Sequence, residues 1–174
     1  NSTVPSDPYP LLVSTNERPT PVPTKSITIQ PQNGFPASSI SAVVSPSTVN
    51  TIARLTVSIT LNNNGRLVGG IDAGSNYVRL MVDNGTITNN SIDVDDVTVN
   101  GLAPSRIEQS GNQLDVFMPN NFDARAGETV EIVLEKGAGF RTVNYVSNTN
   151  QIRIKYDGSY SAVSTQYSTT NSGR

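Results

Sequence analysis

The feature that most constrains this chain is a strict alternation of apolar and polar residues in the segment 52–61. Leu55, Val57 and Ile59 fall at every second position, and Thr or Ser occupies the positions between them. Side chains of an extended strand point to opposite faces in turn, so this spacing predicts a strand with one buried face. No segment shows sustained helical spacing, and the fold is therefore expected to be all-β.

The same two-residue period recurs along the chain between clusters of turn residues. Asn-Gly and Asp-Gly pairs favour positive backbone angles and close hairpins at little cost. Ser110-Gly111-Asn112 is such a cluster, and it favours a hairpin between residues 106–108 and 114–117. The other strands expected are residues 41–44, 77–82, 96–99, 114–118, 129–135, 151–156 and 159–167. Eight or nine short strands with frequent turns indicate an antiparallel β-sandwich, with a barrel as the alternative.

The first 36 residues differ from the rest because they hold eight of the eleven prolines. Proline fixes one backbone angle and removes a hydrogen-bond donor, so this stretch is expected to be extended and polyproline-like. Within it, Ile27 and Ile29 alternate with polar residues and predict a short strand at residues 25–30. The expected organisation is an extended Pro-rich N-terminal arm or linker over residues 1–36, a β-sandwich domain over 37–170 and a C-terminal tail over 171–174.

Composition argues against catalysis, because Cys and His are both absent. Thiol nucleophiles, disulfides and imidazole general bases are thereby removed. Paired carboxylates can hydrolyse glycosides, but one of the pair needs a pKa raised by burial. Glu131 and Glu135 alternate with apolar residues and are expected to point into water. We therefore expect that the protein is not an enzyme.

Charge and hydropathy limit the partners and the location. The formal net charge of −2 supplies no basic field for phosphates, so no nucleic-acid binding is expected. No run approaches the ~20 apolar residues of a membrane helix, so no membrane insertion is expected. The chain begins at Asn1 rather than Met, as it would after removal of a signal peptide. An extracellular or cell-surface location is expected.

Four motifs in the second half resemble immunoglobulin-like repeats of prokaryotic S-layer and other cell-surface structural proteins. They occur in the family's order: the strand end Val97-Thr-Val-Asn-Gly101, then Phe117-Met-Pro119, then Ala126-Gly-Glu-Thr-Val130, then Gly158-Ser-Tyr160. The likeness covers about residues 40–170, and it departs at Phe140-Arg141-Thr142, where the family often carries Asn-Pro. The resemblance implies an immunoglobulin-like antiparallel sandwich, a building block of a cell envelope or filament, and no catalytic residues.

An acidic cluster at Asp93, Asp95 and Asp96 is a candidate calcium site, because calcium accepts carboxylate oxygens from loops. The spacing lacks the glycine and the distal Glu of an EF-hand loop, and a solvated loop is the alternative. No other cofactor is expected.

The late tyrosines Tyr145, Tyr160 and Tyr167 are candidates for stacking against sugars. Core packing is the alternative, and it is favoured for Tyr156, which shares a predicted face with Ile152 and Ile154. Three further residues begin Asn-x-Ser/Thr sequons and are possible glycosylation sites: Asn1, Asn84 and Asn89.

The apolar cluster Leu11, Leu12 and Val13 suggests a role for the N-terminal stretch. Its backbone could add to an exposed sheet edge of another copy while these side chains fill pockets. We expect residues 1–24 to form an intersubunit arm in a filament, pilus-like fibre or surface layer; a flexible linker is the alternative. A carbohydrate-binding or adhesive module that recognises cell-surface glycans, or a virion surface protein, would share these features.

Overall fold

The computed structural model describes residues 12–15, 18–23, 37–70, 77–156 and 160–171. The chain divides into two units, Asn1–Gly34 and Phe35–Arg174. We call the second unit the body. All regular elements longer than one turn are strands, which confirms the all-β expectation for the described residues.

In the N-terminal unit, β1 (Leu12–Thr15) pairs antiparallel with β2 (Arg18–Pro23). Val13 lies opposite Val22 and Thr15 opposite Arg18, with a register shift between these pairs. The structure therefore differs from the unpaired polyproline-like segment predicted here. Proline is compatible with a two-stranded sheet where its missing N–H faces away from the partner strand. The strand predicted at residues 25–30 lies outside the described residues.

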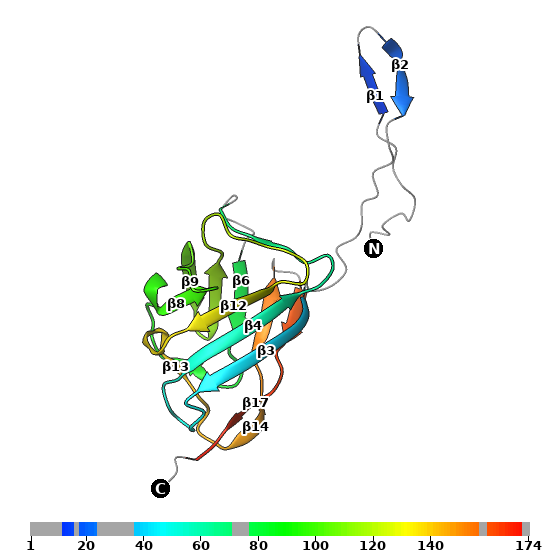
Figure 1. Cartoon of the computed structure of the whole chain (residues 1–174). Helices are drawn as coiled ribbons and strands as arrows, with labels where there is room; N and C mark the ends of the chain where they lie inside the picture. Colours follow the sequence, from blue (N-terminus) through cyan, green and yellow to red (C-terminus); the bar gives the residue numbers. More distant parts are fainter. Residues whose placement is uncertain (1–11, 16–17, 24–36, 71–76, 157–159, 172–174) are drawn as a thin grey trace. The chain divides into compact units, whose positions relative to one another are not determined.

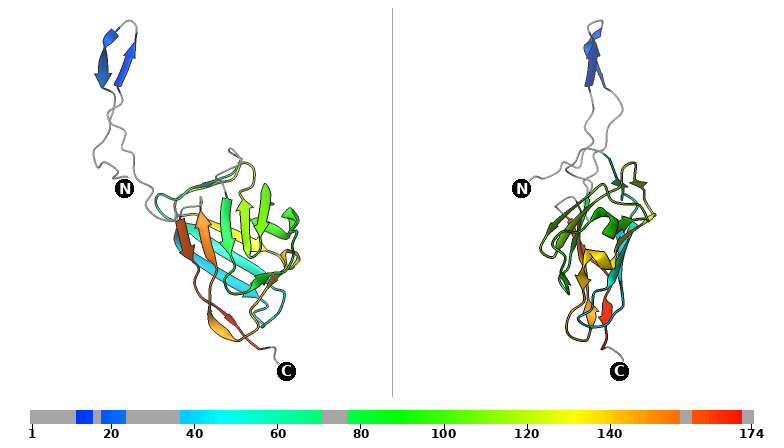
Figure 2. Two further views of the ribbon diagram at one scale, coloured as in Figure 1. Left: turned by 180° about the vertical axis from the view of Figure 1, so that it is seen from behind. Right: turned by 90° about the vertical axis from the view of Figure 1, so that its left-hand side faces the viewer.

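Two antiparallel sheets form the layers of the body, as the edge-on view in Figure 2 shows. The four-stranded sheet has the order β3 (Ala37–Ser45), β4 (Arg54–Leu61), β12 (Thr129–Leu134) and β8 (Val97–Val99). The five-stranded sheet has the order β16 (Tyr160–Val163), β15 (Arg153–Tyr156), β6 (Tyr77–Met81), β10 (Gln113–Phe117) and β9 (Arg106–Ser110).

Shorter elements close the ends of the body. Two-stranded sheets join β5 (Leu67–Val68) to β11 (Asp123–Ala124), β7 (Thr86–Ile87) to β13 (Phe140–Arg141), and β14 (Ser147–Asn150) to β17 (Tyr167–Thr169). Single turns of 3-10 helix occur at η1 (Val94–Asp96) and η2 (Lys136–Ala138).

The core lies between the two sheets and is filled by every second residue of their strands. Leu55, Val57 and Ile59 of β4 are buried on one side, and Leu80, Leu114 and Ile154 of the other sheet are buried with them. Burying one such side chain contributes roughly 1.5–3 kcal/mol to stability. The period of two in the sequence is therefore the direct cause of a two-layer body.

Each strand predicted between residues 41 and 167 corresponds to a strand of the two main sheets, with shifted ends. The segment 96–99 loses its first residue because Val94–Asp96 forms a 3-10 turn. The segment 159–167 is not one strand: β16 ends at Val163 and β17 begins at Tyr167. Ser164 causes this break, because its hydroxyl accepts the N–H of Ile152 and holds the chain where it leaves β16.

The predicted turn chemistry is also confirmed. Asn100 and Gly101 both have positive φ, 49° and 77°, as a tight hairpin turn requires. The predicted hairpin around Gly111 joins β9 to β10 in continuous register.

The C-terminal segment connects the two sheets. After β16, the N–H of Thr165 donates to the carbonyl of Ile40 in β3, 2.9 Å away. Further on, Thr170 forms a parallel bridge with Thr48 and donates its N–H to Ser47. The free edge of β3 is therefore held at both ends by the end of the chain.

Candidate functional site

A row of four charged residues crosses the outer face of the five-stranded sheet. Strand register places Lys155 of β15 opposite Arg79 of β6, Arg79 opposite Asp115 of β10, and Asp115 opposite Glu108 of β9. We call Lys155, Arg79, Asp115 and Glu108 the charged row. The neighbours of Arg79 and Asp115 along their strands are buried in the core, so alternation forces these two charges outward.

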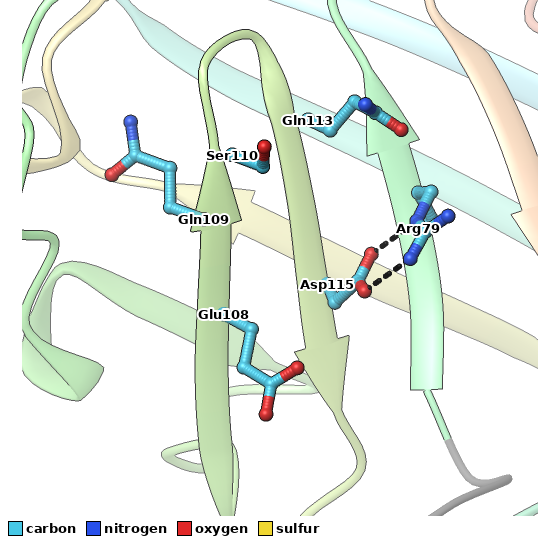
Figure 3. Close-up of a pocket in the computed structure, with 6 residues that line it drawn as sticks. All are labelled: Arg79, Glu108, Gln109, Ser110, Gln113 and Asp115. Carbon is cyan, nitrogen blue, oxygen red and sulfur yellow. Dashed lines mark hydrogen bonds and ion pairs between the residues drawn. The ribbon is translucent and has the colours of Figure 1, made fainter.

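Arg79 and Asp115 form the centre of the row through two parallel hydrogen bonds (Figure 3). Nε of Arg79 donates to Oδ1 of Asp115, and Nη2 donates to Oδ2; both donor–acceptor distances are 2.6 Å. Asp115 is only 8 % exposed although it is charged. The hydrogen bond to Asp115 raises the pKa of Arg79 above its ordinary value. This bidentate geometry fixes the orientation of both side chains.

Aromatic side chains support one end of the face. The rings of Tyr77 and Phe117 lie 5.1 Å apart at 40°. The guanidinium of Arg106 lies 4.0 Å from the Phe117 ring centroid, and its Nη2 lies 3.2 Å from Oε1 of Glu108. Arg106 covers Phe117, so this ring is buried under a cation and offers no free stacking surface.

A shallow depression of about 320 Å³ lies on the acidic half of the face. Its lining consists of Arg79, Glu108, Gln109, Ser110, Gln113 and Asp115. The carboxylate of Glu108 points toward β10 and that of Asp115 toward Arg79, whereas the side chain of Gln109 points away (Figure 3). The depression is thus polar and open, and it suits a cationic group better than an apolar ligand.

The three aspartates of the predicted calcium site lie around η1. The carboxylate of Asp93 accepts the N–H of Asp95 at 3.3 Å and so caps this turn. A Cβ placed on Gly137 would lie 1.8 Å from Oδ1 of Asp96, so this carboxylate rests against the glycine. In the described parts of the chain, no three acidic side chains converge on a position for a metal ion.

Two of the three tyrosines predicted to stack against sugars have described side chains, and these two differ in exposure. Tyr167 is 7 % exposed, and its hydroxyl donates to the carbonyl of Asn84 at 2.7 Å. Burial raises its pKa to about 12. Tyr145 is 53 % exposed, and the side chain of Tyr160 lies outside the described part. Tyr167 is thus buried with the core residues, and its ring is not exposed for stacking. Tyr156 packs against the core, as predicted.

The predicted asparagine and arm residues are placed as follows. Oδ1 of Asn84 accepts the N–H of Gln151, and Nδ2 of Asn89 donates to the carbonyl of Gly137. Leu12 and Val13 lie on β1. Asn1 and Leu11 lie outside the described residues.

Sequence reasoning did not find the charged row. Its members are far apart in the chain, and only strand register brings them together. A local signal was present: Arg79 lies between Val78 and Leu80, and Asp115 lies between Leu114 and Val116. Each charge was therefore bound to face away from the core, but the sequence did not show which strands are neighbours.

Comparisons with known proteins give little similarity. No protein-family model matches the chain, and neither does any curated protein. A solved structure titled "Crystal structure of BslA - A bacterial hydrophobin" is similar, with 15 % identity and a TM-score of 0.44. The alignment covers 77 % of this chain and 98 % of the BslA chain. This similarity is too low to transfer a function.

Within the described residues, no helix has the length and apolar character needed to cross a membrane.

Proposed function

We propose that the protein is a non-enzymatic extracellular structural subunit of a surface filament, pilus-like fibre or surface layer. Copies assemble head to tail, and the N-terminal hairpin of one copy adds to a sheet edge of the next. The observation that carries this proposal is that the hairpin has one edge able to pair and one edge blocked by proline.

The blocked edge belongs to β2. Leu12 lies opposite Pro23, and because proline has no N–H this must be a non-hydrogen-bonded pair. Val13 and Val22 therefore exchange the hydrogen bonds, and Pro21 and Pro23 on either side of Val22 present no N–H to the outer edge. No proline lies on β1, so only its outer edge offers both donors and acceptors. Addition through β1 alone gives the contact a single orientation.

The acceptor edge is proposed to be β16. Of the outermost strands, β3 is held at both ends by the C-terminal segment, and β8 is occupied at Val99, whose N–H donates to Leu102. Charged Arg106 and Glu108 make β9 a poor partner. On β16, Ser164 donates its N–H to Ile152, so the peptide groups of the preceding Val163 face outward. Val163 is 55 % exposed, as expected of a residue that meets a partner.

We further infer that the body is an immunoglobulin-like sandwich. The order β3-β4-β12-β8 has the chain sequence of an immunoglobulin A-B-E-D sheet, and β16-β15-β6 has that of G-F-C. The β9–β10 hairpin is an addition at the C edge. This correspondence supports the resemblance to S-layer and other cell-surface domains, and head-to-tail contacts between such domains propagate into fibres or layers.

Deletion of residues 1–24 tests the arm, and Val163→Lys tests the acceptor edge. Both variants should remain folded by circular dichroism and should lose the polymers that electron microscopy detects in the full chain. A charge on an edge strand prevents strand addition. Val43→Lys is the matched control, because Val43 is 61 % exposed on β3, whose edge is already held. It should polymerise normally.

Polymers that persist in the deletion variant would exclude the arm. Polymers that persist only in Val163→Lys would exclude β16 as the acceptor.

The alternative function, a carbohydrate-binding or adhesive module, predicts selective binding on a glycan array, whereas a structural subunit should show no saccharide preference.

A further inference from the structure

The outer face of the five-stranded sheet is electrostatically two-sided. Over β15 and β6 lie the cations Arg153, Lys155 and Arg79, and Oδ2 of Asp83 lies 2.7 Å from Nη2 of Arg153. Over β10 and β9 lie two anions, Asp115 and Glu108, with one cation, Arg106. The charged row thus runs positive, positive, negative, negative from Lys155 to Glu108.

The two ends of the row do not neutralise each other within one chain. They are separated by three strand spacings, about 14 Å between backbones. Among the described residues, no acidic group forms an ion pair with Lys155. At the opposite end, Glu108 lines the depression, and its side chain is 54 % exposed.

We propose that this face binds the same face of a second copy of the chain. A two-fold axis parallel to the strands and midway between β6 and β10 lays β15 over β9 of the second copy. Lys155 then meets Glu108 of the second copy at the depression, and Glu108 meets Lys155 of that copy. The Arg79–Asp115 pairs of both copies meet at the centre, cation over anion.

A second copy fits this face because a row with the charge order ++−− is self-complementary only under such a rotation. A uniformly charged partner would be attracted to one half and repelled by the other. The fixed geometry of Arg79 and Asp115 reduces the side-chain ordering needed on association. Complementary charges also set the register of the contact and disfavour other registers. The contact uses side chains of the sheet face and leaves the peptide edge of β16 free.

Sedimentation velocity of the full chain across a range of ionic strengths tests the proposal. Dimers are expected at low salt, and they should dissociate as salt screens the charges. Lys155→Glu and Glu108→Lys should each weaken the dimer about tenfold or more, because each places like charges together. Lys136→Glu makes the same charge change on η2, away from this face, and should leave the dimer unchanged.

Charge exchange separates a direct contact from a general charge effect. An equimolar mixture of the two single variants should form heterodimers, because both crossed contacts then join opposite charges. The double variant Lys155→Glu/Glu108→Lys should recover the homodimer. The mixture and the double variant should each recover most of the dimer affinity that the single variants lose.

Three outcomes would overturn the proposal: a full chain that stays monomeric at low salt, dimers unaffected by both single variants, or no rescue in the mixture and the double variant. If the full chain stays monomeric but binds polylysine through Glu108, the acidic half serves a different basic partner. Deletion of residues 1–24 removes the arm and no residue of this face, so it should leave this dimer intact, and failure here is distinguishable from failure of the arm contact.

Discussion

The two outer faces of the body are built by the same alternation and yet differ in chemistry. On the four-stranded sheet, seen toward the viewer in Figure 1, the outward positions are mainly hydroxyl residues: Ser39, Ser41, Thr56, Ser58, Thr60, Thr98 and Thr129. On the five-stranded sheet they include the charged row. The inward positions of both sheets are Val, Ile, Leu and Ala alike. The core therefore fixes the fold, and the outward positions are free to specialise.

The difference has an energetic side. Thr60 and Thr129 share one exposed hydroxyl contact of 3.1 Å, which water can replace. Arg79 and Asp115 share two charge-assisted bonds around a nearly buried carboxylate. Removal of one partner should therefore lower the free energy of unfolding strongly on the charged face and weakly on the hydroxyl face.

The largest effect is expected for Asp115→Ala. It leaves the partly buried guanidinium of Arg79 without its acceptors and should lower the free energy of unfolding by about 2–3 kcal/mol. Urea denaturation at high salt, where self-association is suppressed, measures the loss. Asp123→Ala is the control, because Asp123 also pairs with arginines, Arg66 and Arg125, but at an exposed site. It should cost clearly less than Asp115→Ala, because exposed ion pairs contribute little. Equal losses for the two variants would contradict the distinction.

An intermediate effect is expected for Tyr167→Phe, because Tyr167 is buried with the core and lies on neither outer face. Loss of the hydroxyl leaves the carbonyl of Asn84 without this donor and should cost about 1 kcal/mol. Tyr145→Phe, at an exposed ring, should be neutral.

The same tyrosine predicts an alkaline dependence. Burial raises the pKa of Tyr167 from 10.0 to about 12, so the folded state favours the neutral phenol. Its contribution to stability is complete below pH 10 and is lost as the pH rises to 12. Unfolding followed over this window should show a steeper loss for the natural chain than for Tyr167→Phe. Parallel curves would show that Tyr167 ionises as freely in the folded state as in the unfolded one.

The smallest effect is expected for Thr129→Val on the hydroxyl face. Valine suits a strand, and the lost contact is exposed, so stability should change by less than about 0.5 kcal/mol. The midpoint of urea unfolding is a sufficient measurement. A loss of stability as large as that of Asp115→Ala would contradict the expected difference between the two faces.

The main strands were predictable from sequence because burial of one face requires an apolar residue at every second position. Leu55, Val57 and Ile59 of β4 are the clearest example, and all three are buried. Turns such as Asn100-Gly101 were equally predictable, since few residues adopt positive φ without strain. Both patterns depend only on residues that are close together in the chain, so a single sequence is enough to recognise them.

What could not be predicted depends on neighbours that are distant in the chain. Arg79 and Asp115 are joined by register, and no periodicity shows which strands lie side by side. Tyr167 follows a break at Ser164 that depends on the position of Ile152. The sequence does not predict the β1–β2 hairpin, because proline argues against strand pairing; a sheet of two strands, however, has outer edges where proline fits.

The bonds between the C-terminal segment and β3 have a mechanical consequence. Thr165 bonds to Ile40 and Thr170 to Ser47, so the end of the chain runs alongside β3 in the same direction. Tension applied between the beginning of β3 and the C-terminus would act along both segments and shear them. The hydrogen bonds between the two segments would then bear the force together and would not break one after another.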